Sequence, residues 1–259
     1  MQRSGRLTVR QVPVTKLTPD TVDTMWELYS AHYANVNRPD FDRDLAEKDT
    51  VFLGRDGGTG EVVGFSTALF CTHRYRGRKV GIYFSGDTIV HPSYWGQGAL
   101  HRTVFLQLVR WRLRHPRTPL YWYLICSGYR TYLTLVRNFP HHWPHHERAT
   151  PAWEAGLIDS ISGARYPQAW KPEEGVISFG EVQPIVKASV APFTPAILEL
   201  PEVKFFVQAN PEYARGDELA MIAKVDLTAA RRVLGRLRRR RRRHRPAERR
   251  TTRPGLSVP

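Results

Sequence analysis

The stretch "VHPSYWGQGALHRTV" (residues 90–104) joins a strand-like apolar run to a helix-like one. Residues 79–90 are rich in β-branched and aromatic side chains, which favours a strand. Residues 100–116 repeat apolar side chains at helical spacing and end at a His-Pro pair, which stops the helix. Two glycines therefore fall in a strand-to-helix turn. Free backbone N–H groups and the positive end of a helix dipole make such a turn suitable for a phosphate or pyrophosphate, although a plain tight turn has the same pattern.

The flanking segments extend this pattern in both directions. The sequence predicts a first strand, two helices and a hairpin around the turn "GGTG", at residues 6–14, 18–33, 38–49, 50–56 and 61–75. Residues 119–126 are so continuously apolar that we expect a strand buried on both faces, and residues 129–139 repeat at helical spacing. The expected order up to Phe139 is strand, two helices, three strands, helix, strand, helix.

The regular apolar pattern of the sequence ends at Pro140, and prolines, glycines and aromatic residues are scattered from there on. Short strands are expected at residues 175–180, 203–209 and 218–227. We therefore divide the chain into a core of residues 1–139, a region of residues 140–230 that completes the sheet, and an arginine-rich tail of residues 231–259 that we expect to be disordered.

The opening stretch also resembles motif A of the GNAT (N-acetyltransferase-like) acyltransferases, V-x-P-x-x-R-G-x-G-x-G, and residues 6–139 are similar to that family in element order. Val90, Pro92, Gly96 and Gly98 stand in register with the motif. The resemblance implies an α/β fold with a GNAT-like mixed central sheet flanked by helices and followed by a C-terminal extension. In this extension, residues 140–230 would cover the acceptor side. The resemblance also implies that acetyl-CoA or another acyl-CoA is a co-substrate, held by Ile89, Val90, Gly96, Gln97, Gly98 and Ala99.

Two positions depart from the family pattern, since Trp95 replaces the usual Arg or Gln and Leu100 replaces the last Gly or Ala. These bulky side chains would narrow the loop, favour another acyl carrier or prevent binding. In the family, the strand before the loop is splayed from the next strand along the chain. The resemblance therefore implies that residues 79–90 and 119–126 are adjacent, near-parallel strands that diverge at their C-terminal ends.

Direct acyl transfer to an amine requires a group that accepts the amine proton and a group that protonates the leaving thiolate. Asp87, just before the loop, is the candidate base, although Ser85 and Thr88 could instead satisfy its carboxylate. The family often carries an acidic tyrosine in the helix after the second strand, and here Tyr132 is the candidate, with Tyr129 as an alternative and packing as the other role for both. A covalent route through Cys126 is a further alternative.

The stretch "HHWPHHERAT" (residues 141–150) supplies imidazole and carboxylate groups, which many metals bind. Trp143 and Pro144 interrupt it, so no regular helix places two of its histidines one turn apart. We interpret this stretch as a polar surface loop and expect no metal. The two cysteines, Cys71 and Cys126, lie in apolar runs and are expected to be buried and reduced.

Charge is unevenly distributed over the 259 residues, which carry a formal net charge of +15. The tail has 13 arginines and one acid, Glu248, whereas the rest of the chain has 26 basic and 23 acidic residues. Such a tail favours sequence-independent, salt-sensitive contact with nucleic acid or an anionic membrane, or serves only as a solubilising end. No apolar run reaches the ~18 residues of a membrane span, and the N-terminus lacks the apolar segment of a signal peptide. We therefore expect a cytoplasmic protein.

Two classes of function remain open at this point. The first is a GNAT-like N-acyltransferase that moves an acyl group from acyl-CoA to a small amine or amino acid by direct transfer. The second is a catalytically degenerate GNAT-fold binding module or adaptor, which Trp95 and Leu100 favour. An acyl-carrier-protein-dependent acyl synthase on the same fold would share the chemistry of the first.

Overall fold

The computed structural model describes residues 5–180, 184–187, 190, 193–229, 231 and 235. Almost all of the arginine-rich tail, and with it the prediction that the tail is disordered, lies outside the described residues. Within them, no helix combines the length and the apolar character needed to cross a membrane.

The element order up to Phe139 is the one that the sequence predicts, with a two-residue strand added after the first helix. The helices are α1 (Pro19–His32), α2 (Arg38–Ala46), α3 (Ala99–Arg114), α4 (Tyr129–Asn138), α5 (Ala152–Arg165), α6 (Pro195–Leu198) and α7 (Pro201–Ala209). The 3-10 turns are η1 (Val14–Lys16), η2 (Pro92–Tyr94) and η3 (Tyr213–Arg215). The strands are β1 (Leu7–Pro13), β2 (Tyr33–Ala34), β3 (Thr50–Asp56), β4 (Val62–Tyr75), β5 (Arg78–Val90), β6 (Leu120–Cys126), β7 (His142–Trp143), β8 (Trp170–Lys171), β9 (Val176–Ile177), β10 (Ile185–Val186) and β11 (Glu218–Lys224).

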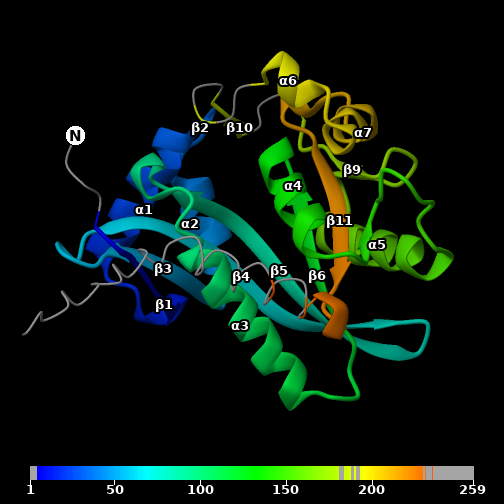
Figure 1. Ribbon diagram of the computed structural model, residues 1–259, viewed down its shortest axis with the longest axis horizontal. Helices are drawn as coiled ribbons and strands as arrows, with labels where there is room; N and C mark the ends of the chain where they lie inside the picture. The colour runs from blue at the N-terminus through cyan, green and yellow to red at the C-terminus, as the bar shows by residue number, and fades with distance from the viewer. Residues whose placement is uncertain are drawn as a thin grey trace, which may run out of the picture.

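A mixed central sheet organises the molecule (Figure 1). Its strands lie in the order β1-β3-β4-β5-β6-β11-β9-β8, with β7 also paired to β11. All of these pairs are antiparallel except β5 and β6, which are parallel. A parallel pair requires a crossover connection, and α3 supplies it. The expected mixed sheet flanked by helices is therefore confirmed.

The parallel pair opens toward its C-terminal end. Hydrogen-bonded register runs only from Gly81 opposite Leu120 to Phe84 opposite Tyr123, although β5 continues to Val90 and β6 to Cys126. Figure 1 shows β5 running toward α1 and α2 while β6 runs toward α4, with β11 antiparallel beside β6. The backbones of β5 and β6 thus diverge at their C-terminal ends, as the family resemblance implies, and the space between the diverging backbones is called the gap below.

The two faces of the sheet build separate cores, because alternate side chains of a strand point to opposite faces. Tyr83 of β5 and Met221 of β11 belong to a cluster that includes residues of α3, α4 and α7. Phe84 and Ile222, their neighbours in sequence, belong to a second cluster together with α5. A third cluster joins α1 and α2 to β3, β4 and the end of β5.

One predicted strand is wrong. Residues 203–209 form part of α7 rather than a strand. Pro201 takes the first helical position, where its missing N–H costs nothing, and Glu202 follows in the first turn. Val203 and Phe206, three residues apart, then share the buried face of the helix. Strands do form within the other two predicted segments, as β9 and β11.

Candidate functional site

The loop after β5 leads into the N-terminus of α3, which has no side-chain cap. Gly96 and Gly98 adopt φ angles of 81° and 67°, in the left-handed region that glycine tolerates best. Gly98 caps α3 without a side-chain hydrogen bond, and the first turn of α3 contains no acidic residue. A Cβ atom added at Gly96 would meet nothing within 4 Å. The turn therefore leaves space beside the positive end of a helix, as anion binding requires.

Side chains of the loop fix its position against the start of the chain. The Gln97 side chain accepts a hydrogen bond from the backbone N–H of Leu7 at 2.8 Å and donates one to the carbonyl of Gly5 at 3.2 Å. The Tyr94 hydroxyl donates to the Asp56 carboxylate at 2.7 Å. The side chain of Gln97, a predicted cofactor residue, thus acts as a brace for the loop, and its backbone remains the part that we assign to the ligand.

Trp95 and Leu100, the two departures from the family motif, take different positions. Leu100 is 3% exposed and packs in the core beneath α3, so its side chain does not narrow the loop. Trp95 is 42% exposed, and its indole N–H donates to the carbonyl of Val90 at 2.6 Å. The guanidinium of Arg130, in the first turn of α4, lies 4.8 Å from the Trp95 ring. Trp95 therefore links the end of β5 to the start of α4, across the mouth of the gap.

Basic side chains gather around this mouth. Arg102 in the first turns of α3 and Arg130 in α4 have no carboxylate partner among the residues that the structure describes. Burial, and then the charges of Arg130 and Lys187, lower the pKa of His32. Lys187 in turn donates to the carbonyl of Ser30 at 2.9 Å. Unpaired guanidinium groups beside a helix N-terminus suit a phosphorylated ligand.

Two carboxyl groups occupy the divergent ends of the strands. A register shift between Ser66 and Ala68 of β4 leaves Gly86 and Asp87 as a bulge in the β4–β5 pairing. Burial, and then the Asp44 carboxylate, raise the pKa of Asp87 to about 7, while the nearby Lys48 ammonium opposes this rise. Burial, and then the charges of Asp87 and Asp44, raise the pKa of Glu218 at the start of β11 to about 8. Both groups are therefore set to titrate near neutral pH.

The hydroxyl groups beside Asp87 bond elsewhere. The Thr88 hydroxyl shares a 2.7 Å hydrogen bond with that of Ser66. The Ser85 hydroxyl accepts from the indole N–H of Trp122 at 2.8 Å. The alternative in which Ser85 and Thr88 satisfy the Asp87 carboxylate thus gains no support from their observed partners.

A buried cation balances part of this negative charge. The side chain of Lys48 is fully buried, and its ammonium donates to the carboxylate of Asp44 at 2.5 Å and to the carbonyl of Asp44 at 2.9 Å. Gly86 leaves room for this arrangement, because a Cβ atom there would lie 3.0 Å from the Lys48 Cε atom and 2.4 Å from the Thr67 hydroxyl. The bulge in β5 and the end of α2 therefore fit together around the lysine.

Aromatic side chains of α1 and β2 border the carboxyl groups on another side. The Asp87 charge contributes, after burial, to raising the pKa values of Tyr29 and Tyr33. Tyr29 also lines a surface hollow of ≈ 270 Å³ between α1 and α2, together with Asn35, Val36, Asn37, Asp40, Phe41 and Pro184. Tyr29 is therefore a residue that lines the hollow and is also affected by the charge of Asp87.

The structure does not gather all the predicted groups in one place. Ile89 points into the core with α1. Tyr132 is fully buried on α4, where its ring stacks near Phe205 and Phe206 of α7, and its hydroxyl has no hydrogen-bond partner among the described residues. Burial raises the pKa of Cys126 well above the ordinary thiol value, which disfavours a reactive thiolate. The sequence prediction also placed Cys71 in the interior, but the structure leaves this thiol exposed.

Glu218 and Lys48 are the residues of this site that sequence reasoning missed. Glu218 lies far from Asp87 in the sequence and reaches it only because β11 inserts beside β6. Its signal in the sequence was a lone acid at the start of an otherwise apolar strand, residues 218–223. Lys48 follows a charged helix and looks like a solvent-exposed residue in the sequence alone.

Comparison with known proteins gives a likeness of fold only. No protein-family model matches the chain, and no curated protein matches it. Among solved structures, the chain is similar to a probable N-acyltransferase of Enterococcus faecalis V583, with 14% identity and a TM-score of 0.38, over 50% of this chain and 32% of that one. It is also similar to Escherichia coli ElaA, with 16% identity, a TM-score of 0.36 and coverage of 56% and 94%. A third is the E. coli GNAT family N-acetyltransferase YhbS in complex with CoA, with 16% identity, a TM-score of 0.35 and coverage of 56% and 78%. The resemblance to GNAT-family N-acetyltransferases therefore covers about half of the chain, which spans about a third of the length of the first of these structures.

Proposed function

We propose that this chain is an N-acyltransferase that moves an acyl group from acyl-CoA to a primary amine by direct transfer. The observation that carries the proposal is the position of two titratable carboxyl groups, Asp87 and Glu218, at the ends of the strands that open the gap. The pKa of Asp87 is raised to about 7 and that of Glu218 to about 8. A general base works best when its pKa lies near the working pH.

The donor side of the proposal rests on the loop and the mouth of the gap. The pyrophosphate of acyl-CoA would bind at the backbone of Gly96, Gln97, Gly98 and Ala99, at the uncapped start of α3. The unpaired guanidinium groups of Arg102 and Arg130 would add charge-assisted hydrogen bonds to the phosphates. The thioester arm would then extend between β5 and β6, beside the backbone of Ile89 and Val90.

In the proposed reaction, the nitrogen of the amine attacks the thioester carbon. The new C–N bond forms, the C–S bond breaks, and Asp87 takes the proton that the nitrogen loses. Glu218, with a pKa raised to about 8, stays largely protonated at neutral pH and adds a neutral carboxyl group beside Asp87. The thiolate takes a proton from a general acid, and Tyr132 remains our candidate for that role from the sequence.

The acceptor side rests on charge and shape. Acidic groups at Asp44, Asp87 and Glu218 surround a site with one buried cation, Lys48. The hollow between α1 and α2 offers Asn35, Asn37 and Asp40 as polar contacts and Phe41 as an apolar one. A small cationic amine or an amino acid fits this chemistry better than an anionic acceptor does.

A transfer assay tests the proposal. Purified protein is mixed with acetyl-CoA and longer acyl-CoAs, and with a panel of primary amines and amino acids. Free thiol and acylated amine are then measured by a thiol reagent and by mass spectrometry. We expect release of CoA that depends on the amine, lowered at least about 100-fold in Asp87→Asn. Tyr132→Phe should lower turnover with little loss of stability. Binding of acyl-CoA without transfer to any amine would argue against the catalytic role.

A second candidate function, a binding module without catalysis, is favoured by one observation. Trp95 occupies the Val90 carbonyl and spans the mouth of the gap. If this link stayed closed, the fold would bind no thioester arm. A carrier-protein-dependent acyl synthase would use the same carboxyl groups, and acyl transfer from an acylated carrier protein but not from acyl-CoA would identify it.

A further inference from the structure

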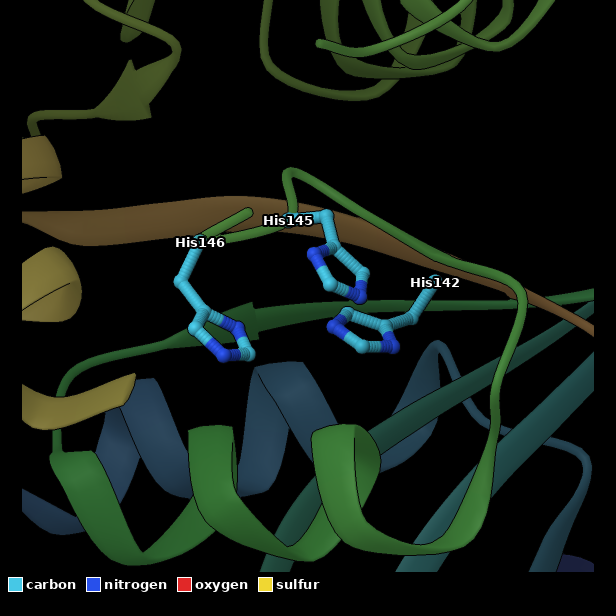
Figure 2. A group of neighbouring side chains, drawn as sticks. All are labelled: His142, His145 and His146. Carbon is cyan, nitrogen blue, oxygen red and sulfur yellow. The ribbon is translucent and has the colours of Figure 1, made fainter. Parts of the chain in front are cut away.

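Three imidazole rings gather on the loop between α4 and α5, away from the carboxyl groups of the proposed active site. His142, His145 and His146 each offer one ring nitrogen to the cluster, and these three nitrogens lie within 4.8 Å of one another. Figure 2 shows the rings grouped beneath the loop, above α4 and beside β11. The sequence predicts a polar surface loop here, whereas in the structure the loop places imidazole side chains in the interior.

His142 is held as a metal ligand would be held. It is 2% exposed and belongs to β7, where it pairs with Ala223 of β11. Its Nδ1 lies 2.7 Å from the carbonyl oxygen of Phe139, which fixes the proton on Nδ1 as the donor. Its Nε2 then carries a lone pair, is buried, and has no hydrogen-bond partner among the described residues. A backbone carbonyl that orients the other nitrogen is the usual support of a metal-binding histidine.

His146 shows the same division between its two nitrogens. Its side chain is 14% exposed, and Nε2 lies 3.7 Å from the Glu147 carboxylate. Its Nδ1 is buried and, among the described residues, also lacks a partner. A buried nitrogen without a partner costs about 1–3 kcal/mol. Two such nitrogens in one cluster indicate a group that is shared between them.

His145 stands between the other two rings. Its centroid lies 4.4 Å from that of His142 and 4.8 Å from that of His146, and all three rings are close to parallel. Its Nδ1 accepts the backbone N–H of Glu147 at 3.0 Å. His145 would exchange this hydrogen bond for a metal bond, which makes it the ligand that has to adjust.

We propose that His142, His145 and His146 bind one divalent transition-metal ion, with Zn²⁺ as the ion that fits three neutral imidazoles best. Zinc bonds histidine nitrogen at about 2.0–2.1 Å in a tetrahedron, so its donors lie about 3.4 Å apart. Binding would require the side chains to rotate out of their present stacked arrangement, so that the donors approach that distance and point at one ion. The fourth position is left for water, because the Glu147 carboxylate lies beside Nε2 of His146 rather than beside the proposed donor, Nδ1.

The ion would anchor the loop rather than take part in acyl transfer. Ala223, opposite His142, lies at the far end of β11 from Glu218. Five residues of strand separate the two positions by about 17 Å. The site therefore ties the connection after α4 to β11, and its loading is separable from acyl-CoA binding.

Zinc titration of the full chain tests the inference. The protein is prepared without an affinity tag, stripped with a chelator and desalted, and Zn²⁺ is then titrated by calorimetry and by thermal shift. We expect one ion per chain and a higher melting temperature. His146→Ala should weaken binding at least tenfold, and so should His142→Ala if it folds. His141→Ala is the matched control, because His141 neighbours the cluster but pairs with Asp226 at 2.7 Å instead.

Cobalt gives an independent measurement. Co²⁺ bound to three imidazoles in a tetrahedral site produces intense visible absorption, which should appear in the wild type and in His141→Ala and be lost in His146→Ala. Circular dichroism of each metal-free variant checks its folding. Absence of saturable Zn²⁺ binding in the wild type would overturn the inference and leave ordered water as the partner of the buried nitrogens. Equal affinity of His146→Ala and His141→Ala would overturn it as well.

Discussion

The indole N–H of Trp95 donates a 2.6 Å hydrogen bond to the carbonyl oxygen of Val90, at the residue where β5 ends. The family resemblance places an acyl-CoA arm along this same stretch of backbone. The ring is stacked with Arg130 of α4 on its other side. The side chain that departs from the family motif therefore connects the end of β5 to the start of α4, and under the proposed function the acyl-CoA arm would have to displace it.

Trp95→Ala should tighten acyl-CoA binding. A hydrogen bond contributes about 0.5–1.5 kcal/mol net, so removing the bond that competes with the ligand should lower Kd by roughly 2- to 10-fold. Stability should fall by less than about 1 kcal/mol, because the side chain is 42% exposed. Calorimetry with acetyl-CoA measures the change. Weaker binding in Trp95→Ala would instead make the indole part of the binding surface.

Gly98→Asp should weaken CoA binding at least tenfold. The substitution places a carboxylate beside the phosphates, and like charges ~4 Å apart repel by about 1 kcal/mol even in water and by more in a partly buried site. Because Gly98 has a φ of 67°, the aspartate also adopts a strained conformation that costs about 1 kcal/mol of stability. Affinity should therefore be measured at a temperature at which the variant is fully folded.

The matched control for this change is Gly77→Asp. Gly77 lies in the turn between β4 and β5, has a φ of 74°, and has open space around an added Cβ. It should lose similar stability and keep its CoA affinity. If both variants lost affinity equally, the effect would come from backbone strain rather than from a phosphate at α3.

The rate of acyl transfer should rise with pH through about 7, because Asp87 has to lose its proton to act as the base and its pKa is raised to about 7. Asp87→Asn should remove this dependence and keep acyl-CoA affinity nearly unchanged. Lys48→Met removes the ammonium that opposes the raised pKa, so the rise should move to higher pH. If the pH dependence of the transfer rate were the same in Lys48→Met as in the wild type, or were still present in Asp87→Asn, the base would be another group.

Glu218→Gln should stabilise the fold at pH 8. The folded pKa of Glu218, about 8, lies above the ordinary value of 4.5, so the folded state binds more protons than the unfolded state between these values. Stability from this group is fully present below about pH 4.5 and is lost as pH rises toward 8. The neutral amide avoids that loss, and a gain of about 2–4 °C in melting temperature corresponds to about 1 kcal/mol. The gain should shrink at pH 5, and a gain that is equal at both values would contradict the assignment.

Deletion of residues 236–259 should leave the free energy of unfolding within about 0.5 kcal/mol, because exposed like charges contribute little packing. The same deletion should abolish most salt-sensitive binding to RNA or anionic vesicles. Chemical denaturation and filter binding measure the two effects. A truncated protein that unfolds several degrees lower would place part of the tail within the folded domain.

The central part of the fold could be predicted because its signals are local. Alternation and apolar runs marked β5 and β6, and helical spacing marked α3, so the crossover and the parallel pair followed from their lengths. The prediction of a strand at residues 203–209 was wrong. Phe205 and Phe206 favour a strand by composition, but Pro201 begins a helix and the spacing of the buried side chains continues it. Competing local preferences of this kind are settled by packing.

The candidate sites were less predictable because they depend on contacts between distant segments. Asp87 could be selected from its place before the loop. Glu218 could not, since only the insertion of β11 beside β6 brings it to the gap. For the histidine loop, the sequence excludes a regular helix that would bring two imidazoles together, and this led to the prediction of a polar surface loop. In the structure, the turn after β7 brings three imidazoles together without a helix.

The central claim is an acyl-CoA site at the start of α3. Calorimetric titration tests it most directly, with acetyl-CoA, a long-chain acyl-CoA and free CoA added in turn to the full chain at near-neutral pH. The proposed function predicts one binding site per chain, with affinity for the CoA moiety that Gly98→Asp reduces at least tenfold and Gly77→Asp preserves. Absence of binding by all three ligands, in a protein shown to be folded, would contradict an acyl-CoA site at the start of α3.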